Sequence, residues 1–291
     1  MNANSIESDA RYSIAVFAYN EESGIERCIR SLYENSDSRL DRVVVLANGC
    51  SDRTVEISNA LISEYSNLEV LEIEVPDKCN AWNTYVHETA SLETPVHFFV
   101  DADVWFVGDV FKHLSKALSS SDVANAAAGF PMSGRNRQAY AKLMTERYCL
   151  FGNCYALKSQ FLSLIREKKF SLPIGLMWID SAITKAVNSD LEDQRRGHND
   201  RIVSIPGCGY AFDSLFFLNP SDIKLYLSRI ARYETGKLQK HFLEQIPFDQ
   251  WPESLSGINQ RALKKLSEGG LSVPWYLKRG VRRRLGKVLP S

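Results

Sequence analysis

The sequence has 291 residues, 44% of them hydrophobic, which is enough for a sizeable core in one large domain or one domain with an appendage. Its 35 basic and 35 acidic residues balance, which argues against nucleic acid as the main partner. The six cysteines include no Cys-x-x-Cys pair, so we expect reduced thiols in a cytoplasmic protein. The polar segment 2–9 is not typical of a signal peptide, and no run of 18 apolar residues predicts a membrane span.

The first hundred residues alternate short apolar runs with amphipathic helical patterns. Strands are predicted over 12–18, 42–47, 68–75 and 96–100, and helices over 22–35, 52–65 and 77–91. This alternation predicts a parallel sheet with right-handed crossovers, an architecture of the nucleotide-binding type.

The pattern becomes looser after Asp103. Helices are predicted over 108–119, 134–148, 177–188 and 220–245, and strands over 123–130, 152–157 and 201–205. We therefore expect an α/β domain over residues 1–215 and a helical extension over residues 216–291.

The apolar strand 96–100 is followed directly by Asp101-Ala102-Asp103. Carboxylates at the C-terminal end of a buried strand lie in the crevice where open α/β sheets bind ligands. Two such oxygen ligands suit Mg²⁺ or Mn²⁺, which keeps other positions free for substrate phosphates. Alternatively, Asp103 simply caps the next helix.

Polar motifs also follow the first three strands. They read Phe17-Ala18-Tyr19-Asn20-Glu21-Glu22, Asn48-Gly49-Cys50-Ser51-Asp52-Arg53-Thr54 and Asp77-Lys78-Cys79-Asn80-Ala81-Trp82-Asn83. With the Asp-x-Asp motif, the chain resembles the inverting family 2 glycosyltransferases. That family has the GT-A fold, a Rossmann-like, mostly parallel sheet flanked by helices. One departure is Asp77, which stands where the family has glycine.

The resemblance implies that residues 1–215 bind a nucleotide sugar, with UDP as the expected nucleotide. It places Asp52, Tyr19 and the backbone of Ala18 at the base, and Glu21 at the base or ribose. Lys78 would contact phosphate, while Asp101 would contact the ribose or reach the metal through water. Asp103 would bind Mn²⁺ or Mg²⁺ directly. The alternatives are that Asp52 caps a helix and that Lys78 is a surface lysine.

Inverting transfer also needs a general base. The family places it in a Glu-Asp pair that opens a helix, and Trp178-Ile179-Asp180 stands at that position with isoleucine in place of glutamate. Asp180 is therefore the predicted base, although it could instead cap its helix.

The segment Arg229–Gly236 resembles the family's Arg-Trp-x-x-Gly element, with Tyr233 in place of tryptophan. The resemblance places Arg229 and Arg232 near the diphosphate and the acceptor. The alternative is that both are ordinary solvated arginines.

The C-terminal segment places apolar residues at every fourth position among basic ones: Leu277, Val281, Leu285 and Leu289. No acidic residue follows Glu268. This pattern is typical of a basic amphipathic helix on an anionic membrane surface, which would make the protein peripheral to the membrane. The alternative is a terminal helix packed on its own domain.

Two other functions were weighed against sugar transfer. A phosphohydrolase of the haloacid dehalogenase type would use Asp101 as nucleophile and Asp103 as acid/base, but that motif normally ends the first strand. An inactive sugar- or lipid-binding module is disfavoured by the intact Asp101, Asp103, Lys78 and Asp180. The acceptor is not identified by the sequence and could be a glycan, a lipid-linked molecule or a small molecule. Its specificity is expected to depend on the loops within residues 131–178 and on the C-terminal helices.

Overall fold

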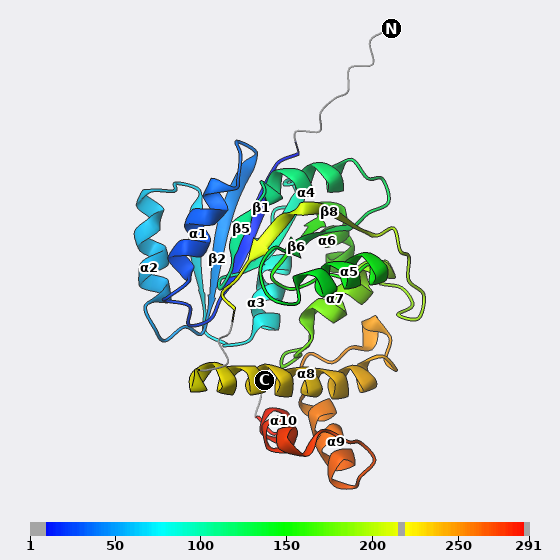
Figure 1. The fold of residues 1–291 in the computed structure, drawn as a ribbon. Helices are drawn as coiled ribbons and strands as arrows, with labels where there is room; N and C mark the ends of the chain where they lie inside the picture. Colours follow the sequence, from blue (N-terminus) through cyan, green and yellow to red (C-terminus); the bar gives the residue numbers. More distant parts are fainter. Residues whose placement is uncertain (1–9, 215–218, 288–291) are drawn as a thin grey trace.

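The fold is built on one mixed sheet. The computed structural model describes residues 10–214 and 219–287, which form an eight-stranded sheet of order β3-β2-β1-β4-β7-β6-β8-β5 (Figure 1). The strands are β1 Tyr12–Ala18, β2 Leu40–Asn48, β3 Leu68–Ile73, β4 Val96–Asp101, β5 Trp105–Val107, β6 Ala126–Pro131, β7 Cys154–Lys158 and β8 Ile202–Ala211. The four strands β1 to β4 pair in parallel as predicted, whereas β7 is antiparallel to both of its neighbours.

Helices cover both faces of this sheet. They are α1 Ile25–Glu34, α2 Thr54–Ala60, α3 Lys78–Thr84, α4 Val110–Ser119, α5 Arg137–Arg147, α6 Ser159–Glu167, α7 Ile179–Asn188, α8 Pro220–Leu243, α9 Ser256–Ser267 and α10 Lys278–Leu285. Buried residues of α1 and α4 pack with Ile14 and Val16 of β1, and those of α3, α6 and α7 pack with Ala15 and Phe17. All seven residues of β1 are buried, which explains why its sequence is a continuous apolar run.

The sheet order brings three polar motifs to one edge. In the pairing of β1, Phe17 lies opposite Asp101 of β4, and Ala18 lies opposite Ala47 of β2. The loops after β1, β2 and β4 therefore leave the sheet side by side at its carboxyl edge, as expected for a ligand crevice.

The C-terminal helices lie across this edge. In Figure 1, α8 runs beneath the sheet, with α9 and α10 on its far side. Leu238 of α8, Ala262 of α9 and Val281 of α10 belong to the same buried cluster as the α3 face of the sheet. The predicted boundary at residue 215 falls outside the described residues and stays a prediction.

The prediction for the tail was wrong about its apolar stripe. Leu277, Val281 and Leu285 are 3%, 0% and 2% exposed, because they pack into the core formed with α8 and α9. These side chains cannot also enter a membrane, so the alternative of a packed terminal helix is correct for them. Leu289 lies outside the described residues, as does the polar segment 2–9. Among the described helices, none is both long enough and apolar enough to cross a membrane.

Candidate active site

The loops after β1 and β2 hold each other through side chains. Asn20, which has a left-handed backbone (φ 54°), accepts a hydrogen bond from the Ser51 amide at 2.8 Å. Asp52 accepts from the amide and hydroxyl of Thr54 at 3.0 and 2.6 Å, and from the Glu22 amide at 3.0 Å. Burial alone would raise the pKa of Asp52, but these hydrogen bonds lower it, so the side chain is ionised and fixed.

This arrangement bears on the roles predicted for the nucleotide base. Asp52 holds the amide of Thr54, the first residue of α2, but the N-cap itself is Arg53, so the capping alternative is not realised as stated. Contact with a base stays a prediction. Tyr19 is 53% exposed beside it, so its ring is available to a ligand. The Ala18 carbonyl accepts from the Cys50 thiol at 3.5 Å, and Ala18 itself is buried.

Lys78 is not a free surface lysine. It is the first residue of α3, its ammonium forms an ion pair with Asp101, and it lies 5.4 Å from the centre of the Phe17 ring. The pair is about 30% exposed on both sides, 32% for Lys78 and 26% for Asp101, so a ligand can reach it. A lysine amine at the crevice is suited to a phosphate group.

Asp77, the departure from the family pattern, caps α3. Its Oδ1 accepts from the amides of Cys79 and Asn80 at 2.8 and 3.1 Å, which fixes the helix start. Its Oδ2 accepts from the Gly175 amide at 2.9 Å. Asp77 therefore ties α3 to the segment that leads into α7.

Three carboxylates gather where β1 and β4 end. An added Cβ at Gly24 would lie 3.9 Å from Glu21 Oε2 and 3.8 Å from the Cα of Asp103, so both residues flank the start of α1. Burial and the negative charges of Asp103 and Asp101 raise the pKa of Glu21 to about 7. Burial and Asp101 also raise the pKa of Asp103. Crowded carboxylates of this kind are stabilised by a bound cation.

These residues fit a divalent metal that is shared with a substrate. Within residues 10–214 and 219–287, no group of three His, Cys, Asp or Glu side chains is arranged to hold an ion alone. Mg²⁺ and Mn²⁺ sites of kinases and polymerases likewise use one or two carboxylates and take further oxygens from phosphates. Asp101 is engaged with Lys78, which leaves Asp103 as the better direct ligand.

Asp180 lies in the first turn of α7, where the charges of Lys78, Arg232 and Asp101 act on it. Its Oδ1 accepts from the Ser181 amide at 3.0 Å, but the N-cap of α7 is Trp178, so Asp180 does not occupy the capping position. Burial raises the pKa of Asp180, while the charges of Lys78 and Arg232 act to lower it. A carboxylate with a raised pKa is the kind of group that serves as a general base.

Helix α8 carries the two predicted arginines. The positive charge of Arg229 acts on Glu21 and Asp103, and that of Arg232 acts on Asp180. Arg229 is half-buried, whereas Arg232 is exposed, so the alternative of a solvated arginine stays open for Arg232. Together with Lys78, they place positive charge around a crevice that is acidic at Asp101 and Asp103.

Sequence reasoning missed the contacts that hold α8 in place. Gln239 of α8, which is fully buried, accepts from the Met177 amide at 2.9 Å and donates to the Gly175 carbonyl at 2.9 Å and to Asn259 of α9 at 3.0 Å. The one signal for this role in the sequence is a glutamine, Gln239, on the apolar side of an amphipathic helix. The network fixes the segment just before Asp180.

Gly236 permits close packing of α8 on the same segment. An added Cβ would lie 2.5 Å from Cδ1 of Trp178, two residues before Asp180. Tyr233 meets the same indole edge-on, with 5.9 Å between ring centres. The Arg-Tyr-x-x-Gly element therefore positions α8 as well as carrying Arg232.

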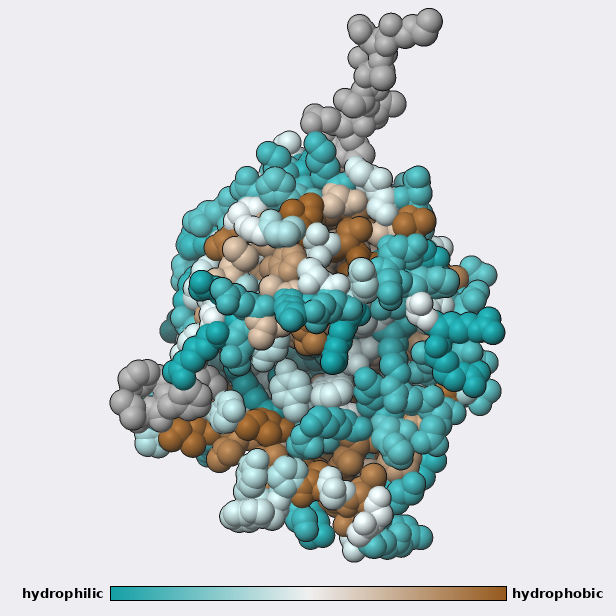
Figure 2. All heavy atoms as spheres, turned by 45° about the vertical axis from the view of Figure 1, so that its right-hand side comes forward, coloured by the Kyte–Doolittle hydropathy of each residue, from teal (hydrophilic) through white to brown (hydrophobic). Residues whose placement is uncertain are grey.

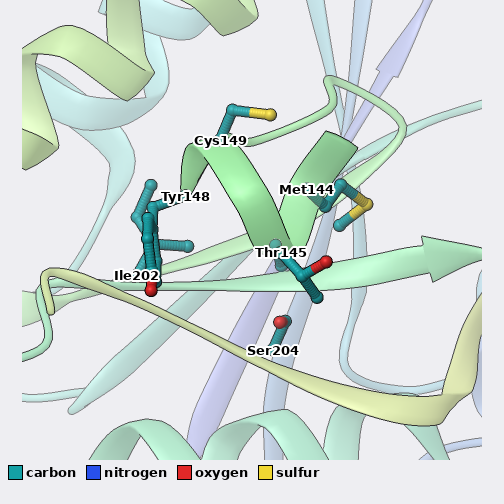
Figure 3. A pocket seen from close by; sticks show the side chains of 7 residues that line it. Met144, Thr145, Tyr148, Cys149, Ile202 and Ser204 are labelled. Atoms are coloured by element: carbon teal, nitrogen blue, oxygen red, sulfur yellow. The ribbon is translucent and has the colours of Figure 1, made fainter. Parts of the chain in front are cut away.

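A pocket of about 260 Å³ lies between α5 and strands β6 and β8 (Figure 3). Its lining residues are Ala128, Met144, Thr145, Tyr148, Cys149, Ile202 and Ser204. Figure 3 shows Thr145 of α5 above Ser204 of β8, with Tyr148 and Ile202 at the other end. The next residue along, Leu150, donates its amide to Thr184 of α7 at 2.9 Å, so the pocket adjoins the helix that begins beside Asp180.

A model of glycosyl transferase family 2 matches residues 13–175, more than half of the chain. No curated protein sequence matches this chain. Among solved structures, the chain is similar to the mannosyltransferase PcManGT of Pyrobaculum calidifontis, solved with GDP-Man and Mn²⁺. The TM-score is 0.63 at 18% identity, over 94% of this chain and 74% of that one.

Two further structures share the fold. Glucosyl-3-phosphoglycerate synthase of Mycobacterium tuberculosis, solved with Mn²⁺, UDP and phosphoglyceric acid, has a TM-score of 0.52 at 20% identity, over 78% of this chain and 80% of that one. S. aureus TarS (1–349) has a TM-score of 0.54 at 16% identity, over 94% and 82% of the two chains. The expected GT-A fold is thereby confirmed.

Proposed function

This chain belongs to glycosyl transferase family 2, and we propose that it transfers a sugar from a nucleoside diphosphate sugar to an acceptor, with inversion at the sugar carbon. The proposal is supported by one observation above the others. The loops after β1 and β4 and the helices α3, α7 and α8 carry charged residues that act on one another: Glu21, Asp101, Asp103, Lys78, Asp180, Arg229 and Arg232. Family membership also removes the phosphohydrolase alternative, and Asp101 ends the fourth strand, not the first.

We assign the donor to the sheet side of the crevice. Asp103, with Asp101 beside it, would hold Mn²⁺ or Mg²⁺ against the diphosphate, and the metal would stabilise the charge on the leaving nucleoside diphosphate. Lys78 and Arg229 add positive charge toward the same oxygens. Tyr19 and Asp52 are the expected contacts of the base, with UDP as the proposed nucleotide, and Glu21 is expected at the base or ribose.

We assign proton removal to Asp180. Inverting transfer requires a base on the side opposite the leaving group, and we expect Asp180 of α7 there, on another element than Asp101 and Asp103. Its carboxylate would take the proton of the acceptor hydroxyl as the new glycosidic bond forms. Burial raises the pKa of Asp180, while the Ser181 amide and the charges of Lys78 and Arg232 act to lower it.

We place the acceptor toward the pocket under α5. The hydroxyl groups of Thr145, Tyr148 and Ser204 and the apolar Met144 and Ile202 suit a molecule with both polar and apolar faces. The six cysteines are all free thiols, which supports a reducing compartment such as the cytoplasm.

The experiment that tests this function is calorimetric titration with UDP-sugars and GDP-mannose, each with and without Mn²⁺. We expect at least one to bind with an affinity that rises at least about tenfold with Mn²⁺, because the metal joins the carboxylates to the diphosphate. Absence of any metal-dependent binding across the panel would contradict the proposal.

A further inference from the structure

The first turns of α8 expose a contiguous group of apolar side chains. Ile223, Leu225, Tyr226 and Leu227 are 43%, 44%, 43% and 44% exposed. Figure 2 shows apolar side chains in a band along the lower edge of the molecule, at the height of α8. Single exposed apolar residues are ordinary, but neighbouring ones on one helix mark an interaction surface.

Cations of α10 adjoin this group. Arg284 donates to the carbonyl of Ser228 at 3.0 Å and to its hydroxyl at 2.7 Å, directly after Leu227. The apolar side of α10 is buried, whereas Lys278, Arg279, Arg282 and Arg283 of this helix and Lys287 just after it are exposed. No acidic residue lies in the chain after Glu268 to neutralise them.

Two aromatic residues precede α10 and face solvent. Trp275 is 83% exposed and Tyr276 is 57% exposed, with 5.8 Å between their ring centres. Trp and Tyr are enriched where a protein meets the headgroup region of a bilayer, because each ring is apolar and carries one polar group.

We propose that these residues form a docking surface for an anionic lipid bilayer. The α8–α10 surface comprises Ile223–Leu227, Trp275, Tyr276 and the exposed cations of α10. The apolar residues would enter the interface while the cations contact lipid headgroups. A second copy of the chain is a poorer occupant, since a symmetric contact would bring the α10 cations of both copies together.

This surface differs from the one predicted from the sequence. The tail contributes its charges and Trp275, while Leu277, Val281 and Leu285 hold α10 against α8 and α9. The surface also lies beside the crevice, because Arg229 follows Leu227 by two residues and acts on Glu21 and Asp103. Docking requires no sugar transfer, so the two proposals can fail separately.

The experiment is sedimentation of the full chain with phosphatidylglycerol-containing vesicles and with pure phosphatidylcholine vesicles, at low and high salt. We expect partitioning onto anionic vesicles at low salt that exceeds that onto neutral ones at least about tenfold and is lost at high salt. Two double variants, Ile223→Ser with Leu227→Ser and Arg282→Glu with Arg283→Glu, should each lower partitioning about tenfold or more.

The matched controls are Ile62→Ser, at a side chain that is 39% exposed, and Lys112→Glu, at an exposed cation of α4. Both control variants should partition like the wild type. Circular dichroism and UDP titration check that each variant is folded. Equal binding to neutral vesicles, unchanged partitioning of both double variants, or a dimer that the Ile223→Ser/Leu227→Ser variant abolishes would each overturn the proposal. Deleting residues 274–291 is a poorer test, because it removes the buried Leu277, Val281 and Leu285.

Discussion

The two walls of the crevice are built in different ways. The sheet wall consists of loops directly after β1, β2 and β4, whose positions follow from strand pairing such as Phe17 opposite Asp101. The α8 wall depends on contacts between distant residues, such as Gln239 with Met177 and Gly236 with Trp178. The same crevice therefore has one wall that local sequence specifies and one that only the packed structure specifies.

The sharpest way to separate the walls is to remove the predicted base. Asp180→Asn should lower turnover by about 10² or more and leave UDP affinity near the wild-type value, because proton removal matters only in the transition state. Steady-state kinetics with the donor found by titration, together with calorimetry, checks this.

The matched control is Asp193→Asn, a carboxylate paired with Arg195 in an exposed loop, which should keep turnover within about threefold. If Asp180→Asn behaved like this control, the base would have to lie elsewhere.

The stability of the sheet wall should depend on pH through His97 of β4. This ring is buried, accepts from the Tyr85 hydroxyl at 2.9 Å and donates to the Ser91 carbonyl at 3.0 Å. Burial lowers the pKa of His97 from 6.5 to about 4. Between these two pH values, His97 is protonated in the unfolded chain and neutral in the folded one. The free energy of unfolding therefore decreases as pH falls from about 6.5 toward 4, by up to about 3 kcal/mol.

Denaturant unfolding of the wild type and of His97→Gln at several pH values measures this. The slope of unfolding free energy against pH is compared between the two proteins over this range. The difference between the slopes gives the contribution of His97. Equal slopes would contradict a neutral, buried His97.

Adding even a methyl group at Gly236 should destabilise the α8 wall. In Gly236→Ala, the new Cβ would lie 2.5 Å from the Trp178 ring, so ring and helix must separate. We expect a loss of about 2 kcal/mol in unfolding free energy. Turnover should also decrease, while UDP affinity should change little, because we propose that UDP binds the sheet wall.

Gly257→Ala in α9 is the matched control, because an added Cβ there meets no atom within 4 Å and alanine favours a helix. Equal stability of both variants would show that α8 does not need its close contact with Trp178.

This contrast also explains what the sequence predicted. Periodicity placed β1 at Tyr12–Ala18 and located the other early strands to within a few residues, and the motifs after them named the charged residues of the crevice. It missed β5, a strand of only three residues whose order comes from pairing with β8. It also missed α6 and α9, which border a core formed by residues far apart in the chain.

The roles of single residues also depend on contacts that are distant in the sequence. Asp77 stands where the family has glycine, and its role in the structure is to cap α3 and to accept from the Gly175 amide. The stripe of Leu277, Val281 and Leu285 is compatible with a membrane or with a core, and only the position of α8 decides for the core. Patterns report that a face is apolar, not what covers it.

The central claim is that Asp103 holds a divalent metal against the diphosphate of the donor. Calorimetric titration of UDP into the wild type, Asp103→Asn and the control Asp109→Asn, each with and without Mn²⁺, tests it most directly. We predict that Mn²⁺ strengthens UDP binding to the wild type and the control at least about tenfold and has no such effect on Asp103→Asn. Metal-dependent binding that survives in Asp103→Asn would contradict the account.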